Sequence, residues 1–176
     1  MVFSSLLFLF LFLPAVLTLY YCSPRRIRNL ILFVTSLFFY AWGEPVYIVI
    51  MLVSTLTDYF FGLLLDKPSL SAAKRKGVVA LSVVVNLTLL SYFKYADFLI
   101  GNINALFGTD IPLTDLPLPI GISFYTFQVL TYTVDVYRGK APVMRNLPRL
   151  MLYISCFPQL IAGPIVRFVD VQEQLQ

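Results

Sequence analysis

The sequence has 176 residues, of which 59% are hydrophobic and 12% are charged, and its formal net charge is +4. Soluble domains carry about twice that share of charged residues, and in water a chain of this size would expose large apolar patches. The composition therefore excludes a soluble globular domain and indicates a membrane protein. A nucleic-acid-binding protein is also a poor interpretation, because the basic residues lie in loops between apolar segments.

Two kinds of side chain that often carry chemistry are missing or isolated. The sequence contains no histidine, which excludes histidine acid–base chemistry, catalytic triads and most zinc or haem sites from this stretch of chain. The two cysteines, Cys22 and Cys156, are far apart and show no metal-ligand or disulfide spacing. We therefore predict neither a metal site nor a bound cofactor in these residues.

Long apolar segments follow one another along the chain. A spanning helix needs about 20 predominantly apolar residues, and the second segment reaches that length only if its helix begins inside the preceding loop. The first segment lacks the basic start and the cleavage site of a signal peptide, so we expect a retained helix. No low-complexity linker divides the chain. We predict one all-α membrane domain over 1–176, with five or six spanning helices at 2–21, 30–42, 45–65, 77–95, 119–137 and 150–166.

Basic residues gather in alternate loops, which sets the expected orientation. Almost all of them lie in the first, third and fifth loops, whereas the second and fourth loops carry mainly acids. Cytoplasmic loops of membrane proteins carry the excess of Lys and Arg, so the N-terminus is expected outside. The predicted cytoplasmic loops hold Arg25, Arg26 and Arg28, then Lys67, Lys74, Arg75 and Lys76, then Arg138, Lys140, Arg145 and Arg149.

The long outer loop that follows the fourth span has a pattern of its own. Apolar residues recur there at helical spacing. Asp97 is suited to an N-cap, and Gly108 is suited to a C-terminal stop. The pattern predicts a short amphipathic helix over 97–108 that lies on the outer membrane surface.

The fifth span carries polar residues at regular intervals. Burying Gln or Asp in lipid costs about 2–3 kcal/mol each near the bilayer centre, so their helix face must turn toward protein or water. This face either joins helices within the bundle or lines a hydrated substrate cavity, and both interpretations stay open. Spacings of four and three place five candidate residues on it: Gly121, Tyr125, Gln128, Tyr132 and Asp135.

Polar residues also lie inside the third and fourth spans. Asp58 shares a helix face with Met51, Thr55 and Gly62. A carboxyl that pins helices together is the simpler interpretation, and a proton-relay or substrate role is the alternative, so Asp58 joins the candidate cavity-lining residues. Asn86 begins an Asn-Leu-Thr glycosylation sequence, but it lies inside a predicted span, and we interpret the match as chance.

Two prolines and a glycine interrupt the sixth candidate span. Each proline removes a backbone donor, and carbonyls freed at membrane depth must find protein or cavity water. A broken or re-entrant segment would return its final arginine to the cytoplasmic side, whereas a straight span would leave it outside. We favour the broken form, and the sequence alone does not decide. Its candidate residues are Pro158, Gln159, Gly163, Pro164 and Arg167.

Two stretches resemble signatures of a known family. The first runs Leu-Pro-Ile-Gly-Ile-Ser-Phe-Tyr-Thr-Phe-Gln over 118–128 and continues as Asp-Val-Tyr-Arg-Gly over 135–139. The second is Phe-Pro-Gln-Leu-Ile-Ala-Gly-Pro-Ile-Val-Arg over 157–167, and softer matches precede both in the right order. Along essentially its whole length the chain resembles the membrane-bound O-acyltransferases (MBOAT), in the branch that contains the alginate O-acetylation membrane protein.

The resemblance implies a multi-pass protein of the bacterial inner membrane. Such an enzyme takes an acyl group from a cytoplasmic donor, acetyl-CoA or a similar compound, and passes it to a secreted, alginate-like polysaccharide, often with a periplasmic or extracellular partner protein. In that family the catalytic histidine lies in the later half of a longer chain. No catalytic residue can therefore be carried over, and the chain resembles the N-terminal part of such an enzyme, expected to be inactive alone.

Two other classes of function stay open. In a small transporter or channel, the polar face of the fifth span would line a pore and the protein would pass solutes across liposomes. A non-catalytic scaffold would bind a secreted polysaccharide-modifying enzyme through the outer loop 97–116.

Overall fold

Every regular element in the described residues is a helix. The computed structural model describes residues 5–160, 166–172 and 174, and the all-α prediction is confirmed for these ranges. Two of the described helices, α3 and α4, are long and apolar enough to cross a membrane. The elements are η1 (Phe8–Phe12, a π-helix), α1 (Leu13–Cys22), α2 (Arg25–Gly43), α3 (Ile48–Leu65), α4 (Ala72–Phe107), α5 (Ile122–Tyr137), α6 (Leu147–Ser155), α7 (Phe157–Leu160) and α8 (Phe168–Val171).

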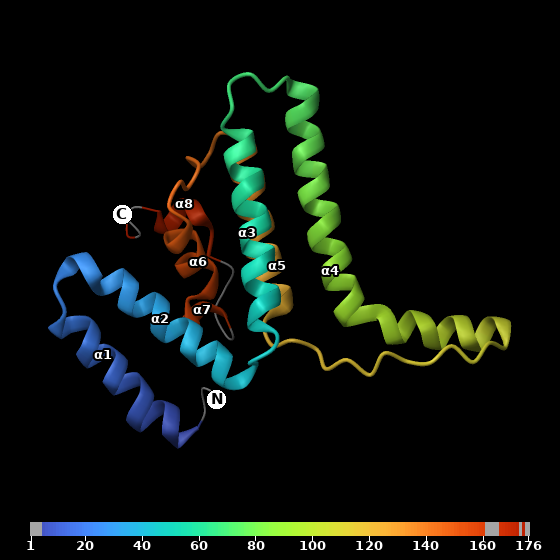
Figure 1. The fold of residues 1–176 in the computed structure, drawn as a ribbon, viewed down its shortest axis with the longest axis horizontal. Helices are drawn as coiled ribbons and strands as arrows, with labels where there is room; N and C mark the ends of the chain where they lie inside the picture. Colours follow the sequence, from blue (N-terminus) through green and yellow to red (C-terminus); the bar gives the residue numbers. More distant parts are fainter. Residues whose placement is uncertain (1–4, 161–165, 173, 175–176) are drawn as a thin grey trace.

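The helix α5 lies at the centre of the packing. It contacts α3, α4, α6 and α8, while α1 packs on α2 and α2 packs on α6. Figure 1 shows α3 and the first part of α4 side by side. The helices α6, α7 and α8 form a group next to α3, and α1 and α2 lie on the other side of this group. Two fully buried tyrosines, Tyr125 and Tyr132, place the core along α5.

A close backbone approach fixes the start of α5. Gly121 caps this helix in the left-handed conformation, with a φ of 77°. A Cβ atom at this position would come 3.0 Å from the carbonyl oxygen of Leu160 in α7. Glycine therefore meets two requirements here, because it tolerates a positive φ and lets α7 approach the α5 N-terminus.

Several helices differ in their bounds from the prediction. The second helix begins at Arg25, inside the basic loop, so it has the length that 30–42 lacked. Pro24 serves as its N-cap residue, in an extended conformation. The third begins at Ile48, because Pro45 lies in the turn that leads into it. The fifth begins at Ile122 rather than at 119, after the glycine cap.

The prediction of a separate helix over 97–108 is wrong. This segment is the end of α4, which continues unbroken to Phe107 because no proline or capping break interrupts it. Asp97 therefore lies inside α4 and is not an N-cap. Gly108 does end the helix, with a φ of 64°. The helix bends partway along, and its last part turns away from the other helices (Figure 1).

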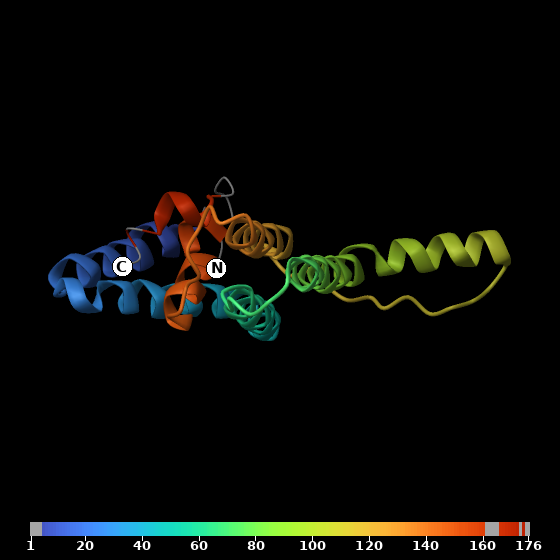
Figure 2. The ribbon, with the colours of Figure 1, turned by 90° about the horizontal axis from the view of Figure 1, so that it is seen from above.

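The end of α4 and the chain that follows form a projecting arm, residues 97–118. Its extended half runs back beside the helix toward the other elements (Figure 2). The Asp97 carboxylate accepts hydrogen bonds from the backbone N–H of Thr114 at 2.7 Å and from its hydroxyl at 2.6 Å. The Asn104 side chain donates to the carbonyl of Ile111 at 2.9 Å and accepts from its N–H at 3.0 Å. These bonds hold the two halves of the arm together.

The sixth candidate span is interrupted within the described residues. The helix α6 ends at Ser155, the backbone leaves the helical conformation at Cys156, and α7 follows. Pro158 has no N–H with which to continue the helical bonding pattern, and the N–H of Phe157 meets the hydroxyl of Ser36 at 3.3 Å. Gly163 and Pro164 lie outside the described residues, so re-entry into the membrane stays a prediction.

The three basic loops lie at one end of the helices. Arg145 forms an ion pair with Asp66 at 2.8 Å, which joins the loop after α5 to the loop after α3. Arg26, in the first turn of α2, and Arg149, in the first turn of α6, line one cavity of about 220 Å³. Alternate loops of a helical bundle lie at the same end of the bundle, as they do here. The side of the membrane on which this end lies stays a prediction.

Candidate functional site

The polar face of α5 is buried against other helices. Tyr125 and Tyr132 are fully buried, Gln128 is 2% exposed and Asp135 is 7% exposed. On another face of the same helix, Phe127 is 43% exposed. The polar face therefore turns toward protein, and the outward face is apolar, as the cost of placing Gln and Asp in lipid requires.

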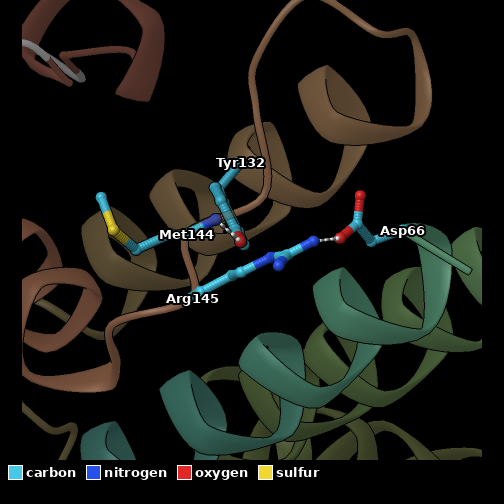
Figure 3. Close-up of polar contacts among 4 residues, drawn as sticks. All are labelled: Asp66, Tyr132, Met144 and Arg145. Atoms are coloured by element: carbon cyan, nitrogen blue, oxygen red, sulfur yellow. Dashed lines mark hydrogen bonds and ion pairs between the residues drawn. The ribbon is translucent and has the colours of Figure 1, made fainter.

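Most members of this face have identified contacts. The Gln128 amide donates to the backbone carbonyl of Tyr153 at 2.7 Å. The Tyr132 hydroxyl accepts from the backbone N–H of Met144 at 3.1 Å, next to the Arg145–Asp66 ion pair (Figure 3). The Tyr125 hydroxyl is buried and has no hydrogen-bond partner within the described residues. The face thus combines helix-joining contacts with one unpaired buried hydroxyl.

Asp58 lies in a second polar group, which we call the Asp58 cluster. Its carboxylate accepts hydrogen bonds from the Ser82 hydroxyl, from the Asn86 amide at 2.6 Å and from the Thr133 hydroxyl at 2.9 Å. The Ser54 hydroxyl donates to the Asn86 side-chain oxygen at 2.9 Å. The cluster therefore comprises Ser54, Asp58, Ser82, Asn86 and Thr133, all of which are buried.

The Asp58 cluster connects α3, α4 and α5. Both carboxylate oxygens have partners, and the Asn86 amide also donates to the Ser82 carbonyl at 3.0 Å. A buried carboxyl with this many donors is held in one place. The geometry favours the pinning interpretation over a proton relay. The sequence signal that was missed is the pair Ser82 and Asn86, one helical turn apart in an apolar part of α4. The glycosylation match at Asn86 stays a chance one, but the Asn86 side chain is a member of the cluster.

Asp135 lies at a different place from the Asp58 cluster. It lines a cavity of about 320 Å³ between α4 and α5, together with Arg138, Lys140 and Arg167. The structure thus brings together Asp135 and Arg167, two of the residues singled out in the sequence. Gln159 lines another cavity of about 160 Å³ beside Tyr153, and its side-chain nitrogen is buried without a partner in the described ranges.

The all-helical fold, the large exposed apolar side chains and the two long apolar helices support a membrane location for this protein. No family model and no solved structure matches the chain. Among curated proteins, it is 44% identical over 178 residues to the probable alginate O-acetylase AlgI of Azotobacter vinelandii, which covers 99% of this chain and 36% of the relative. The corresponding protein of Pseudomonas putida is 45% identical over 178 residues, covering 99% of this chain and 37% of the relative.

A relative that is named for a different substrate also matches. The peptidoglycan O-acetyltransferase of Helicobacter pylori is 31% identical over 205 residues, which cover 100% of this chain and 39% of that protein. These relatives confirm the resemblance to the membrane-bound O-acyltransferase family that the motifs indicated. It spans just over a third of the length of the curated relatives it matches.

Proposed function

We propose that this chain forms the N-terminal part of an enzyme that transfers acetyl groups across the bacterial inner membrane to a secreted, alginate-like polysaccharide. The observation that carries the proposal is the similarity along 99% of the chain to proteins named alginate O-acetylases. The matched relatives are much longer, so the chain alone is proposed to be inactive. The acyl donor, acetyl-CoA or a similar compound, and the polysaccharide acceptor belong to the complete enzyme.

The proposed topology has five or six spans with the N-terminus outside. Its support is the position of the basic loops, which lie at one end of the helices. That end would face the cytoplasm, where loops rich in Lys and Arg are found. The acyl donor would then approach from the end of α5 that carries Asp135, and the acceptor from the end that carries Gly121.

The polar face of α5 is proposed as one wall of the acyl path. Its support is the buried Tyr125 hydroxyl, which has no hydrogen-bond partner in the described residues. Buried polar groups without protein partners are usually satisfied by water or by a ligand. The Asp58 cluster would hold α5 in place from the opposite side, through Thr133.

The arm is the proposed contact site for a secreted partner protein. It exposes large apolar side chains, including Phe98, Leu106 and Phe107, at 67%, 78% and 75%. Exposed apolar groups that project from a membrane protein mark contacts with lipid or with another protein. Replacing 97–116 by a Gly/Ser linker is expected to abolish co-purification with the polysaccharide-modifying partner. Unchanged co-purification would exclude this contact.

A chimera tests the proposed function. The matched 178-residue segment of the A. vinelandii relative is replaced by this chain, and O-acetylation of the secreted polysaccharide is measured in cells that lack the native gene. The chimera is expected to restore acetylation, and the 176-residue chain alone is expected to give none. A folded chimera at normal abundance that gives no acetylation would contradict the proposal.

Within that chimera, Gln128→Leu tests the acyl path. The substitution removes the bond to the Tyr153 carbonyl and the polarity of the wall, so acetylation is expected to fall at least tenfold. Phe124→Leu, on an exposed face of the same helix, is the matched control and is expected to retain activity. Solute flux through liposomes that contain the 176-residue chain alone would instead support a transporter.

A further inference from the structure

The cavity between α4 and α5 has two chemically different ends. Its walls are apolar side chains of the two helices, Val83 from α4 and Phe127, Leu130 and Val134 from α5. Its mouth carries charged side chains that follow α5 or precede α8. The volume is about 320 Å³, and the polar lining residues are Thr131, Asp135, Arg138, Lys140 and Arg167.

The turn after α5 directs its cations to this mouth. Gly139 is in the left-handed conformation, with a φ of 68°. The N–H groups of Lys140 and Ala141 both donate to the carbonyl of Asp135, at 2.9 and 3.3 Å. This C-terminal cap folds the chain back on the last turn of α5, so Lys140 lies beside the cavity rather than extending away from it.

The charge balance of the mouth favours an anion. Arg138, Lys140 and Arg167 are exposed, and the ion pair identified within the described residues joins two other side chains, Arg145 and Asp66. Asp135 is the acid that faces the three cations in this cavity, so a net positive charge remains. The C-terminus of a helix is itself unfavourable for an anion, so the basic side chains must provide the attraction.

We propose that this cavity binds an anionic phospholipid, with the phosphate held by Arg138, Lys140 and Arg167 and an acyl chain along the apolar wall. Basic pockets between membrane helices bind anionic headgroups in this way. A soluble phosphate would leave the apolar wall unused, and a neutral lipid would leave the cations unpaired. The Asp135 carboxylate can accept a hydrogen bond from a headgroup hydroxyl, which phosphatidylglycerol provides. The inference does not depend on the proposed acyltransferase function.

Lipid titration of the purified 176-residue chain tests the proposal. Phosphatidylglycerol binding is measured by native mass spectrometry for the wild type and for Arg138→Gln/Lys140→Gln/Arg167→Gln. The triple variant is expected to bind about a hundredfold more weakly, since each cation near an anionic surface contributes roughly a factor of five. The matched control removes three cations from the loop before or at the start of α4, with the variant Lys67→Gln/Lys74→Gln/Lys76→Gln.

The control variant separates a site from general attraction. It is expected to lose less than threefold in affinity, and equal losses in the two triple variants would overturn the proposal. Phosphatidylcholine with the same acyl chains is expected to bind at least tenfold more weakly than phosphatidylglycerol to the wild type. Competition by glycerol phosphate at an equal concentration would overturn it as well, because that result would show a phosphate site without a lipid.

A labelling experiment keeps the test independent of variant folding. Phosphatidylglycerol with a photoreactive acyl chain is incorporated into vesicles with the wild-type chain, and the labelled peptides are identified. Labelling is expected on 127–134 and at Val83, and Phe127→Ala is expected to reduce it severalfold. Labelling confined to the outward faces of other helices would overturn the proposal.

Discussion

Replacement of Asp58 by leucine tests whether this carboxyl holds three helices together. In the native protein it accepts hydrogen bonds from Ser82, Asn86 and Thr133. Interhelical hydrogen bonds in membrane proteins average about 0.6 kcal/mol each, with a maximum near 1.7. Loss of the three bonds therefore predicts a decrease of about 2 kcal/mol in the free energy of unfolding.

Two features keep the expected loss of unfolding free energy at about 2 kcal/mol, which corresponds to the average bond rather than to the maximum. Hydroxyl groups of Ser and Thr can rotate toward a carbonyl of their own helix, so Ser82 and Thr133 are not left unpaired. Asn86 retains its bond to the Ser82 carbonyl at 3.0 Å. Asp58→Asn is expected to cost about half as much as Asp58→Leu, because its amide oxygen still accepts a hydrogen bond.

Unfolding by SDS in mixed micelles, followed by circular dichroism, measures these changes. Thr57→Val is the matched control, because the Thr57 hydroxyl bonds within its own helix, to the Val53 carbonyl at 2.8 Å. A double-mutant cycle between Asp58→Leu and Asn86→Leu is expected to show a coupling of about 1 kcal/mol. Wild-type stability of Asp58→Leu, or strict additivity with Asn86→Leu, would refute the pinning role.

Two further predictions follow from local geometry. A Cβ atom at Gly62 would lie 2.8 Å from the Tyr132 hydroxyl. Gly62→Ala is therefore expected to lower the free energy of unfolding in SDS by about 1–3 kcal/mol. Gly77→Ala is the control and should not destabilise the protein, because a Cβ atom there meets no atom within 4 Å. In the arm, the hydrogen bond from the Thr114 side chain, and to a lesser extent that from its backbone N–H, lower the pKa of Asp97 below its usual 3.8. The contact between Asp97 and Thr114 is therefore fully formed above pH 3.8 and is lost as the pH falls through the lowered pKa. The Thr114 amide resonance should titrate with that midpoint, and Thr114→Val should raise it; a flat resonance would contradict the contact.

The sequence alone predicted the features that follow from the free-energy cost of placing polar groups in lipid. The spacing of Gln128 and Asp135 predicted one inward face, and both are buried against protein. Local capping signals were less reliable. Asp97 has the composition of an N-cap, but nothing before it breaks the helix, so α4 continues and the carboxylate bonds to Thr114 instead.

The partners of Asp58 could not be predicted, because they depend on the packing of helices distant in the sequence. Thr133 lies 75 residues from Asp58, and Ser82 lies 24 residues from it. Hydropathy treats Ser and Thr in a span as near neutral, so neither stands out in the sequence. The difference between a pinning carboxyl and a proton relay depends on those partners and not on the residue type.

The buried polar groups of α5 differ in how completely they are paired. Thr133 bonds Asp58 within a cluster whose carboxylate oxygens both have partners, and Gln128 bonds the backbone carbonyl of Tyr153. Nearer the N-terminus of the helix, the hydroxyls of Tyr125 and Thr126 are buried and have no partner in the described residues. A fully paired interface resists opening, and an interface with unpaired groups gains free energy by admitting water or a polar ligand. We therefore expect any opening along α5 in its N-terminal half, beside Tyr125 and Thr126, rather than at the Asp58 cluster.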